Sequence, residues 1–121
     1  MKTIWIVDDD ASIRFVLERA LAREQLRTRS FSQAREVLDA IDEQGDEVPQ
    51  LLVSDIRMPG DSGLELLRLI RQRLPRLPVI IMTAFADLDS AVAAFQRGAF
   101  EYLPKPFDVP KAVELIQRAA R

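Results

Sequence analysis

Cysteine and histidine are both absent from this chain of 121 residues. Without cysteine there are no disulfides, thiolate nucleophiles or cysteine-based zinc sites, and nothing in the sequence indicates an oxidising compartment. Without histidine there is no Ser–His or Cys–His catalysis, no histidine-ligated metal and no phosphohistidine carrier on this chain. Any reactive site must therefore be built from carboxylates, hydroxyls, lysine or arginine.

Long hydrophobic runs and an excess of one charge are also missing. The apolar run at the N-terminus is too short for a signal peptide, and no later segment reaches the ~18 apolar residues of a membrane span. The 17 basic and 19 acidic residues give a net charge of −2, and the basic residues are scattered among the acidic ones rather than gathered in a stripe. We expect a cytoplasmic protein that contacts neither membranes nor nucleic acid directly.

A chain of 121 residues with 48% hydrophobic residues predicts one packed domain. Apolar runs of strand length recur, and amphipathic segments with three- and four-residue spacing separate them. The strands are expected at 3–7, 27–31, 51–54, 79–83 and 99–103, and the helices at 12–24, 32–44, 64–74, 87–96 and 108–121. This alternation predicts a flavodoxin-like (βα)5 fold, an α/β domain with a doubly wound parallel sheet of strand order 2-1-3-4-5.

Capping residues mark the expected helix ends. The predicted N-terminal caps are Ser12 for the first helix, Ser32 or Ser30 for the second, Asp87 for the fourth and Asp108 for the last. Gly98 is placed to end the fourth helix. The first helix is expected to turn five apolar residues inward, namely Ile13, Val16, Leu17, Ala20 and Leu21.

Acidic side chains follow the first and third expected strands. Asp8 and Asp9 come directly after the first strand, and Asp55 follows the third. Ligands of doubly wound sheets bind at the carboxyl ends of the strands, where the strand order reverses, which is between these two strands. Crowded carboxylates repel one another, so one pKa rises or a cation is required. Since only oxygen ligands are available, the fitting ion is Mg²⁺.

The fourth and fifth strands add Thr83 and Lys105 at the same edge of the predicted sheet. A carboxylate nucleophile beside a divalent cation, an ammonium and a hydroxyl suits phosphoryl transfer, because that reaction needs mainly positioning and charge neutralisation. The expected product is an aspartyl phosphate on Asp55. Each residue alone has an ordinary alternative, as a solvated loop group, a helix cap, a strand-end residue or a surface lysine. Their arrival at equivalent strand ends favours the site.

These residues lie in stretches that resemble the response-regulator receiver family over the whole length of the chain. The stretches are Ile6-Val7-Asp8-Asp9, Ser54-Asp55-Ile56-Arg57-Met58-Pro59-Gly60, Met82-Thr83-Ala84 and Leu103-Pro104-Lys105-Pro106-Phe107. The resemblance implies that Asp55 is the phosphoacceptor. It also implies that Asp9, Asp55 and the main-chain oxygen of Arg57 bind Mg²⁺ directly. Asp8 would bind the ion through water.

The same resemblance implies a two-state switch. Thr83 and Lys105 would contact phosphoryl oxygens, and the peptide bond between Lys105 and Pro106 would be cis. Phosphorylation would draw Thr83 inward, and Tyr102 would fill the space beside the fifth strand. The expected surface that changes consists of Leu88, Val92, Phe95 and Tyr102. An aromatic residue half-buried on a strand is the ordinary alternative for Tyr102.

A narrower resemblance is to the nitrogen regulatory protein C (NtrC) branch of this family. It is carried by Ser12-Ile13-Arg14, by the stretch from Asp55 to Gly60, by Asp87-Leu88-Asp89-Ser90-Ala91-Val92 and by Gly98-Ala99-Phe100-Glu101-Tyr102-Leu103. This branch implies a sensor histidine kinase as phosphodonor and a homodimer formed on phosphorylation. It also implies an attached ATPase that acts on sigma-54 RNA polymerase and a DNA-binding domain, neither of them within residues 1–121. The last helix runs into Arg121 without a stop signal, which indicates a longer protein.

Two features depart from the patterns of the family. Phe85-Ala86 stands where the branch usually has His-Ser, and Asp61-Ser62 stands where receivers often have Met-Asp. The third aspartate in the row, Asp10, leaves open which neighbours would hold the metal.

Other functions fit the sequence less well. A haloacid-dehalogenase-like phosphatase also forms an aspartyl phosphate, but it needs an aspartate two residues after the nucleophile, where this chain has Arg57. A receiver whose output ignores phosphate usually loses one of the acidic, threonine or lysine positions, and all are present. A single-domain phosphoryl shuttle stays open. We therefore expect a signalling domain that catalyses only its own phosphorylation and dephosphorylation, and not an enzyme acting on other substrates.

Overall fold

The structure is a computed structural model that describes residues 3–44, 48–56, 63–84 and 88–120. Its strands are β1 (Thr3–Val7), β2 (Arg27–Phe31), β3 (Leu51–Asp55), β4 (Val79–Ala84) and β5 (Glu101–Lys105). Its helices are α1 (Ala11–Ala22), α2 (Ala34–Gln44), α3 (Gly63–Arg73), α4 (Leu88–Gln96) and α5 (Val109–Ala119). All strand pairs are parallel, in the order β2-β1-β3-β4-β5. The predicted doubly wound fold is confirmed.

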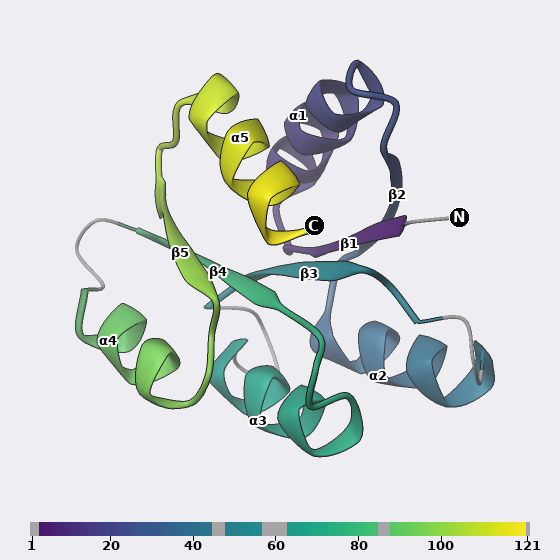
Figure 1. The fold of residues 1–121 in the computed structure, drawn as a ribbon, viewed down its shortest axis with the longest axis vertical. Coiled ribbons are helices and arrows are strands. Elements are labelled where there is room, and N and C mark those ends of the chain that lie inside the picture. Colours follow the sequence, from purple (N-terminus) through teal and green to yellow (C-terminus); the bar gives the residue numbers. More distant parts are fainter. Residues whose placement is uncertain (1–2, 45–47, 57–62, 85–87, 121) are drawn as a thin grey trace.

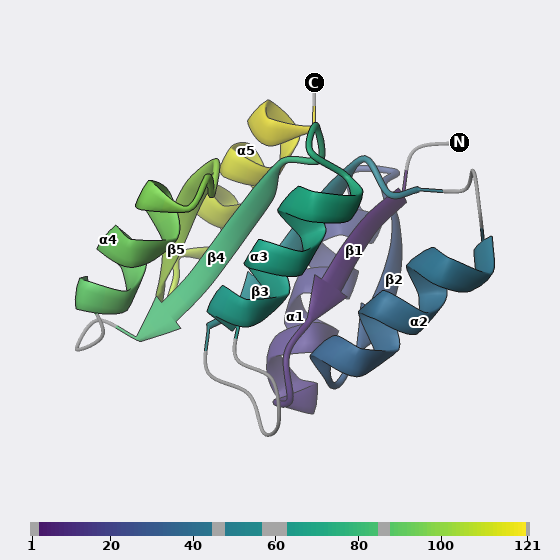
Figure 2. The ribbon, with the colours of Figure 1, turned by 90° about the horizontal axis from the view of Figure 1, so that it is seen from below.

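Helices cover both faces of the sheet. Figure 1 shows α1 and α5 together on one face and α2, α3 and α4 on the other, and Figure 2 shows the three-helix side from below. Successive strand residues point to opposite faces, so Trp5 and Val7 enter the core on the α2–α4 side. Ile4 and Ile6 enter the core on the α1/α5 side. This two-sided burial explains why the three inner strands, β1, β3 and β4, are almost continuously apolar, whereas the edge strands β2 and β5 are more polar.

The fifth strand begins two residues later than the predicted 99–103. Ala99 N–H donates to the carbonyl of Ala94 at 3.0 Å, so Ala99 closes the turn that follows α4 and is not part of the sheet. Pairing with β4 instead continues to Lys105, which lies opposite Ala84. Pro104 is tolerated within β5 because an edge strand has one side without a partner strand for its missing N–H. The strand therefore delivers Lys105 directly to the carboxyl edge of the sheet.

The start of α1 differs from the prediction. Asp10, rather than Ser12, is the N-terminal cap, and its Oδ1 accepts the Ser12 N–H at 2.8 Å. Asp10 is the cap because an N-terminal cap residue has a non-helical backbone. The Asp10 backbone is extended, whereas Ser12 already lies inside the helix. Val16 was expected to face inward but is 39% exposed, while Leu17 and Leu21 are fully buried.

The other helix ends agree with the predictions more closely. Gly98 follows α4 with φ of +102°, a conformation that glycine adopts readily. Asp108 occupies the N-terminal cap position of α5 with Pro110 in the first turn, although its side chain makes no capping hydrogen bond. The predicted cap Asp87 lies outside the described residues. No helix in the described part of the chain is long and apolar enough to cross a membrane.

The start of α2 is held by a glutamate within the helix. Glu36 Oε1 accepts the Ser32 N–H at 3.0 Å, the Ser32 hydroxyl at 2.6 Å and the Gln33 N–H at 3.1 Å. The predicted caps are therefore wrong, because α2 begins at Ala34, two residues after Ser32, and Ser30 lies within β2. Ser32 supports the start of the helix only as a donor to Glu36.

Candidate functional site

Three carboxylates meet at the carboxyl edge of the sheet. β1 and β3 are neighbours, and Val7 lies opposite Ser54, so the residues that follow each of them are brought together. Asp8, Asp9 and Asp55 each offer a carboxylate oxygen, and these oxygens lie within 4.8 Å of one another. The structure thus brings together residues that are 46 positions apart in the sequence (55 − 9).

Lys105 bridges two of these carboxylates. Its Nζ lies 2.7 Å from Asp8 Oδ2 and 3.3 Å from Asp55 Oδ1, and the peptide bond from Lys105 to Pro106 is cis, as the resemblance implied. Burial alone would lower the pKa of Lys105, but the hydrogen bond and the charge of Asp8 outweigh it and raise that pKa above its ordinary value. The ammonium therefore stays protonated and holds the ends of β1, β3 and β5 together.

Asp55 is buried and oriented by its neighbours. It is 8% exposed, and its Oδ1 accepts the N–H of Ile56 at 2.9 Å. Burial, followed by the charge of Asp8, raises the pKa of the Asp55 carboxyl above its ordinary value, and Lys105 opposes this shift. Asp55 and Asp8 share the single ammonium of Lys105, which leaves part of their negative charge without a counter-charge. A bound cation would therefore stabilise the ionised form of Asp55.

Asp8 is the most heavily bonded residue of the site. It is fully buried, and its N–H donates to the Phe31 carbonyl at 3.1 Å. Its carbonyl accepts from Arg14 Nη1 at 2.6 Å, its Oδ1 accepts the Asp10 N–H at 2.8 Å, and its Oδ2 accepts from Lys105. Every polar group of Asp8 therefore already has a protein partner.

Asp9 and Asp10 have different surroundings. Asp9 is exposed and forms no hydrogen bond or ion pair with any residue that the structure describes. Asp10 caps α1 and is not a member of the carboxylate cluster. The sequence left open which of these aspartates could bind a cation. Asp9 is free to do so, whereas the Asp10 side chain already accepts a hydrogen bond from the first turn of α1.

Thr83 lies at the same edge as the carboxylates. Asp55 pairs with Met82 of β4, so Thr83 is one residue beyond the partner of Asp55, and it is buried at 2% exposure. Arg57, the predicted main-chain ligand, lies outside the described residues.

The residues expected to report the switch lie to the side of the site. The rings of Tyr102 and Phe95 meet edge to face with centroids 5.7 Å apart, so β5 and α4 are in direct contact there. Val92 and Phe95 are 49% and 41% exposed. The side chain of Leu88 is not among those described.

Two residues that support the site were not singled out from the sequence. Arg14 reaches back from α1 to the Asp8 carbonyl. Gly63 begins α3 so close to β3 that an added Cβ would lie 2.3 Å from the carbonyl oxygen of Asp55. Local sequence carried no signal for either contact, because each joins a helix to the end of another element.

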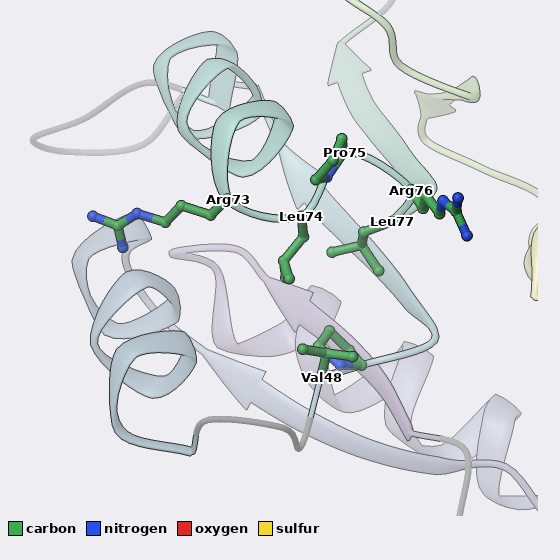
Figure 3. Close-up of a pocket in the computed structure, with 7 residues that line it drawn as sticks. Val48, Arg73, Leu74, Pro75, Arg76 and Leu77 are labelled. Atoms are coloured by element: carbon green, nitrogen blue, oxygen red, sulfur yellow. The ribbon is translucent and has the colours of Figure 1, made fainter.

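A separate hollow of about 340 Å³ lies elsewhere on the molecule. Val48 and Pro49 of its lining precede β3, and its other lining residues, numbers 73–77, precede β4, so it lies at the amino ends of the strands. In Figure 3 the apolar side chains of Val48, Leu74 and Leu77 gather there while Arg73 and Arg76 point away to opposite sides. This hollow is therefore no part of the carboxylate site.

Comparisons with known proteins agree with the geometry. The family model described as the response regulator receiver domain matches residues 4–117. The DNA-binding transcriptional regulator NtrC of Escherichia coli strain K12 is 59% identical over 116 residues, which cover 96% of this chain. The chain spans about a quarter of the length of such curated relatives, 24% for this one.

Solved structures agree as well. The apo receiver domain of nitrogen regulatory protein C has a TM-score of 0.87 and 57% identity, covering 98% of this chain and 94% of that one. The receiver domain of NtrX from Brucella abortus has a TM-score of 0.89 and 34% identity, covering 97% of each chain. The chain belongs to the response regulator receiver domain family, in its NtrC-like branch.

Proposed function

We propose that Asp55 is the phosphoacceptor of this receiver domain and takes its phosphoryl group from a sensor histidine kinase. The observation that carries the proposal is the convergence of three carboxylates and one ammonium at a single edge of the sheet. A nucleophile placed among charges that can neutralise a phosphoryl group is what phosphoryl transfer requires.

The donor set fits Mg²⁺. It offers oxygen ligands only, and a small hard cation of this kind retains waters and binds through one or two carboxylates. Asp9 and Asp55 would hold the ion directly with the main-chain oxygen of Arg57, and Asp8 would act through water, because all its polar groups have protein partners. When bound, Mg²⁺ neutralises charge on the oxygens of the transferring phosphoryl group.

The protein's own residues have distinct tasks in the transfer. Asp55 Oδ1 accepts the Ile56 N–H, so Oδ2 is the oxygen left to attack phosphorus. The new oxygen–phosphorus bond forms as the bond from phosphorus to the donor breaks, and the donor leaves with that electron pair and gains a proton. Lys105 Nζ would attract the phosphoryl oxygens, and the Thr83 hydroxyl would donate to one of them.

The test is phosphorylation by acetyl phosphate in the presence of Mg²⁺. We expect the intact mass to rise by one phosphoryl group, and hydroxylamine to remove it because the product is an acyl phosphate. Asp55→Asn and chelation of the metal should each abolish the gain. Asp108→Asn is a matched control, because it changes an exposed carboxylate outside the cluster. If the mass of Asp55→Asn still rose by one phosphoryl group, another residue would be the phosphoacceptor.

The signal would leave the site through Thr83 and Tyr102. The edge-to-face contact of Tyr102 with Phe95 links β5 to the partly exposed face of α4, so a shift of either ring alters that surface. A coupling of about 1–3 kcal/mol is enough to change a partner interface. We expect a homodimer to form on phosphorylation and Phe95→Ala to weaken it without preventing phosphorylation of Asp55. Analytical ultracentrifugation of both forms decides this.

The output would be control of transcription. Support comes from relatives such as E. coli NtrC, a DNA-binding transcriptional regulator in which the matched region is a quarter of the protein. Within that scheme, residues 1–121 form one cytoplasmic receiver domain that controls an attached sigma-54-dependent ATPase and DNA-binding domain of the nitrogen-regulation type. The test is transcription from a sigma-54 promoter by the full-length protein, which should depend on Asp55.

A further inference from the structure

The Arg14 guanidinium forms a hydrogen bond with a main-chain carbonyl and not with one of the neighbouring carboxylates. It lies near the N-terminus of α1, next to a cluster of three carboxylates, yet its Nη1 donates to the main-chain carbonyl of Asp8 at 2.6 Å. Among the described residues it forms no ion pair with a carboxylate. The helix dipole disfavours a cation at this end of a helix, whereas the negative charges of the carboxylate cluster and of Glu36 favour one.

The bonded carbonyl belongs to the peptide unit that joins Asp8 to Asp9. A peptide unit is planar, so holding its oxygen also fixes the directions of the Asp9 N–H and of the N–Cα bond that leads to the Cα from which the Asp9 side chain departs. Of the other three bonds of Asp8, the one from the Asp10 N–H to Asp8 Oδ1 closes a turn around the same peptide from its side-chain end. Among the described residues, only Arg14 donates a hydrogen bond to the carbonyl oxygen of this peptide. Asp9 itself has no partner among the described residues.

We infer that Arg14 is a positioning residue of the phosphorylation site, which orients the Asp9 carboxylate toward Asp55 by clamping the peptide between Asp8 and Asp9. This inference rests on the proposed function, because it assumes that Asp9 and Asp55 share a divalent cation. The bond to a carbonyl also leaves every carboxylate of the cluster free of Arg14.

The alternative is that Arg14 matters only as a nearby charge, and the two roles predict opposite signs. A positive charge beside a cation site weakens cation binding, so removing the charge alone would tighten it. Removing a clamp lets the Asp9 carboxylate move away from Asp55, which would weaken binding. Groups that orient metal ligands typically change metal affinity by about 10- to 100-fold.

The experiment measures Mn²⁺ binding by the electron paramagnetic resonance of the free ion. Arg14→Met keeps the aliphatic stem and removes the guanidinium, and Arg14→Lys restores one donor and the charge. Arg19→Met is the matched control, because Arg19 lies on the same helix over the Phe15 ring and away from the site. We expect about tenfold weaker binding in Arg14→Met, an intermediate value in Arg14→Lys and an unchanged value in Arg19→Met.

Phosphorylation by acetyl phosphate adds a second readout. In Arg14→Met the Mg²⁺ concentration for half-maximal rate should rise about tenfold, while the rate at saturating Mg²⁺ stays close to that of the parent chain. Unchanged or tighter Mn²⁺ binding in Arg14→Met, or an equal loss in Arg19→Met, would overturn the inference. A parent chain that neither binds Mn²⁺ nor gains a phosphoryl group would instead refute the proposed function. If Arg14→Met does not fold, as judged by circular dichroism, Arg14→Lys decides, because it keeps the charge and changes only the donor. Weaker Mn²⁺ binding by folded Arg14→Lys than by the parent chain would support the clamp. Mn²⁺ affinity and Mg²⁺ dependence equal to those of the parent chain would count against it.

Discussion

Three consecutive aspartates have three different environments in this receiver domain. Asp8 is buried and bonded at every polar group, Asp9 is exposed without a described partner, and Asp10 caps a helix. Each environment follows from where the chain turns out of β1 into α1 and not from the side chain, which is the same in all three. The chemistry of a carboxylate here is therefore decided by its backbone position.

Glu36 offers a test of residue-scale electrostatics away from the site. Its hydrogen bonds from Ser32, followed by one from the Gln33 N–H, hold the pKa of the Glu36 carboxyl below its ordinary value. A lowered folded-state pKa means that the stabilisation is complete above the ordinary value for glutamate and is lost as the pH falls through the lowered one. Glu36→Gln should reduce the free energy of unfolding by about 0.5 kcal/mol at pH 7, a small value because the group is exposed.

Urea unfolding of the parent chain and Glu36→Gln at pH 7 and in acid measures this effect. The difference between the two proteins should shrink as the Glu36 carboxyl is protonated. Glu114→Gln, an exposed position on α5, serves as the control and should change stability little at either pH. A difference between the two proteins that did not shrink in acid would mean that the cap works without the charge.

At the scale of elements, the site depends on how closely α3 approaches the end of β3. The Gly63 N–H donates to the Ile56 carbonyl at 2.8 Å, and a Cβ at Gly63 would lie 2.6 Å from Ile56 Cα as well as 2.3 Å from the Asp55 oxygen. These neighbours are backbone atoms, which cannot turn aside as a flexible side chain can. Glycine is therefore needed here for close packing of a helix against a strand.

Gly63→Ala should push α3 away from β3. We expect a loss of about 2–3 kcal/mol in the free energy of unfolding, since overpacking against backbone is relieved only by moving an element. The same shift displaces Asp55, so phosphorylation by acetyl phosphate should slow as well. Gln72→Ala, an exposed change in the same helix, should alter stability by less than about 0.5 kcal/mol. Thermal unfolding and intact mass report the two effects, and a Gly63→Ala protein with parent-like values in both would refute the close approach.

At the scale of the whole molecule, one sheet separates two cores. Leu17 lies in the core on the α1/α5 side, and Leu66 lies in the core on the α2–α4 side. Neither core is complete without the shared strands, since alternate residues of each strand enter opposite cores. The two sides should therefore unfold together.

Leu17→Ala tests this cooperativity. It should lower the free energy of unfolding by about 2–5 kcal/mol, because Leu17 is fully buried. The sole tryptophan, Trp5, lies in the opposite core and is 2% exposed, so its fluorescence reports the other side of the sheet. We expect the fluorescence and the far-ultraviolet circular dichroism transitions to shift together in urea, as they should in Leu66→Ala. A fluorescence transition that stayed in place in Leu17→Ala would mean that the cores unfold separately.

The order of elements and the edge that carries the site could both be predicted from the sequence. Hydrophobic periodicity is a local property of the sequence, so it predicts the alternation of strands and helices directly. Parallel strands have their carboxyl ends at one edge, so acidic, hydroxyl and lysine residues at or just beyond the ends of four strands gather there. The convergence of Asp8, Asp9 and Asp55 with Lys105 follows from this rule.

Only the tertiary structure decided which atoms are in contact at the carboxyl edge of the sheet and in the elements that lead to it. Asp10 rather than Ser12 caps α1, β5 runs on to Lys105, and Val16 stays exposed, because each outcome depends on how an element docks and not on its own residues. The clamp of Arg14 on Asp8 and the close approach of Gly63 to Asp55 join elements across the end of the sheet. Such contacts have no sequence period, since they exist only once helices and strands have taken their places.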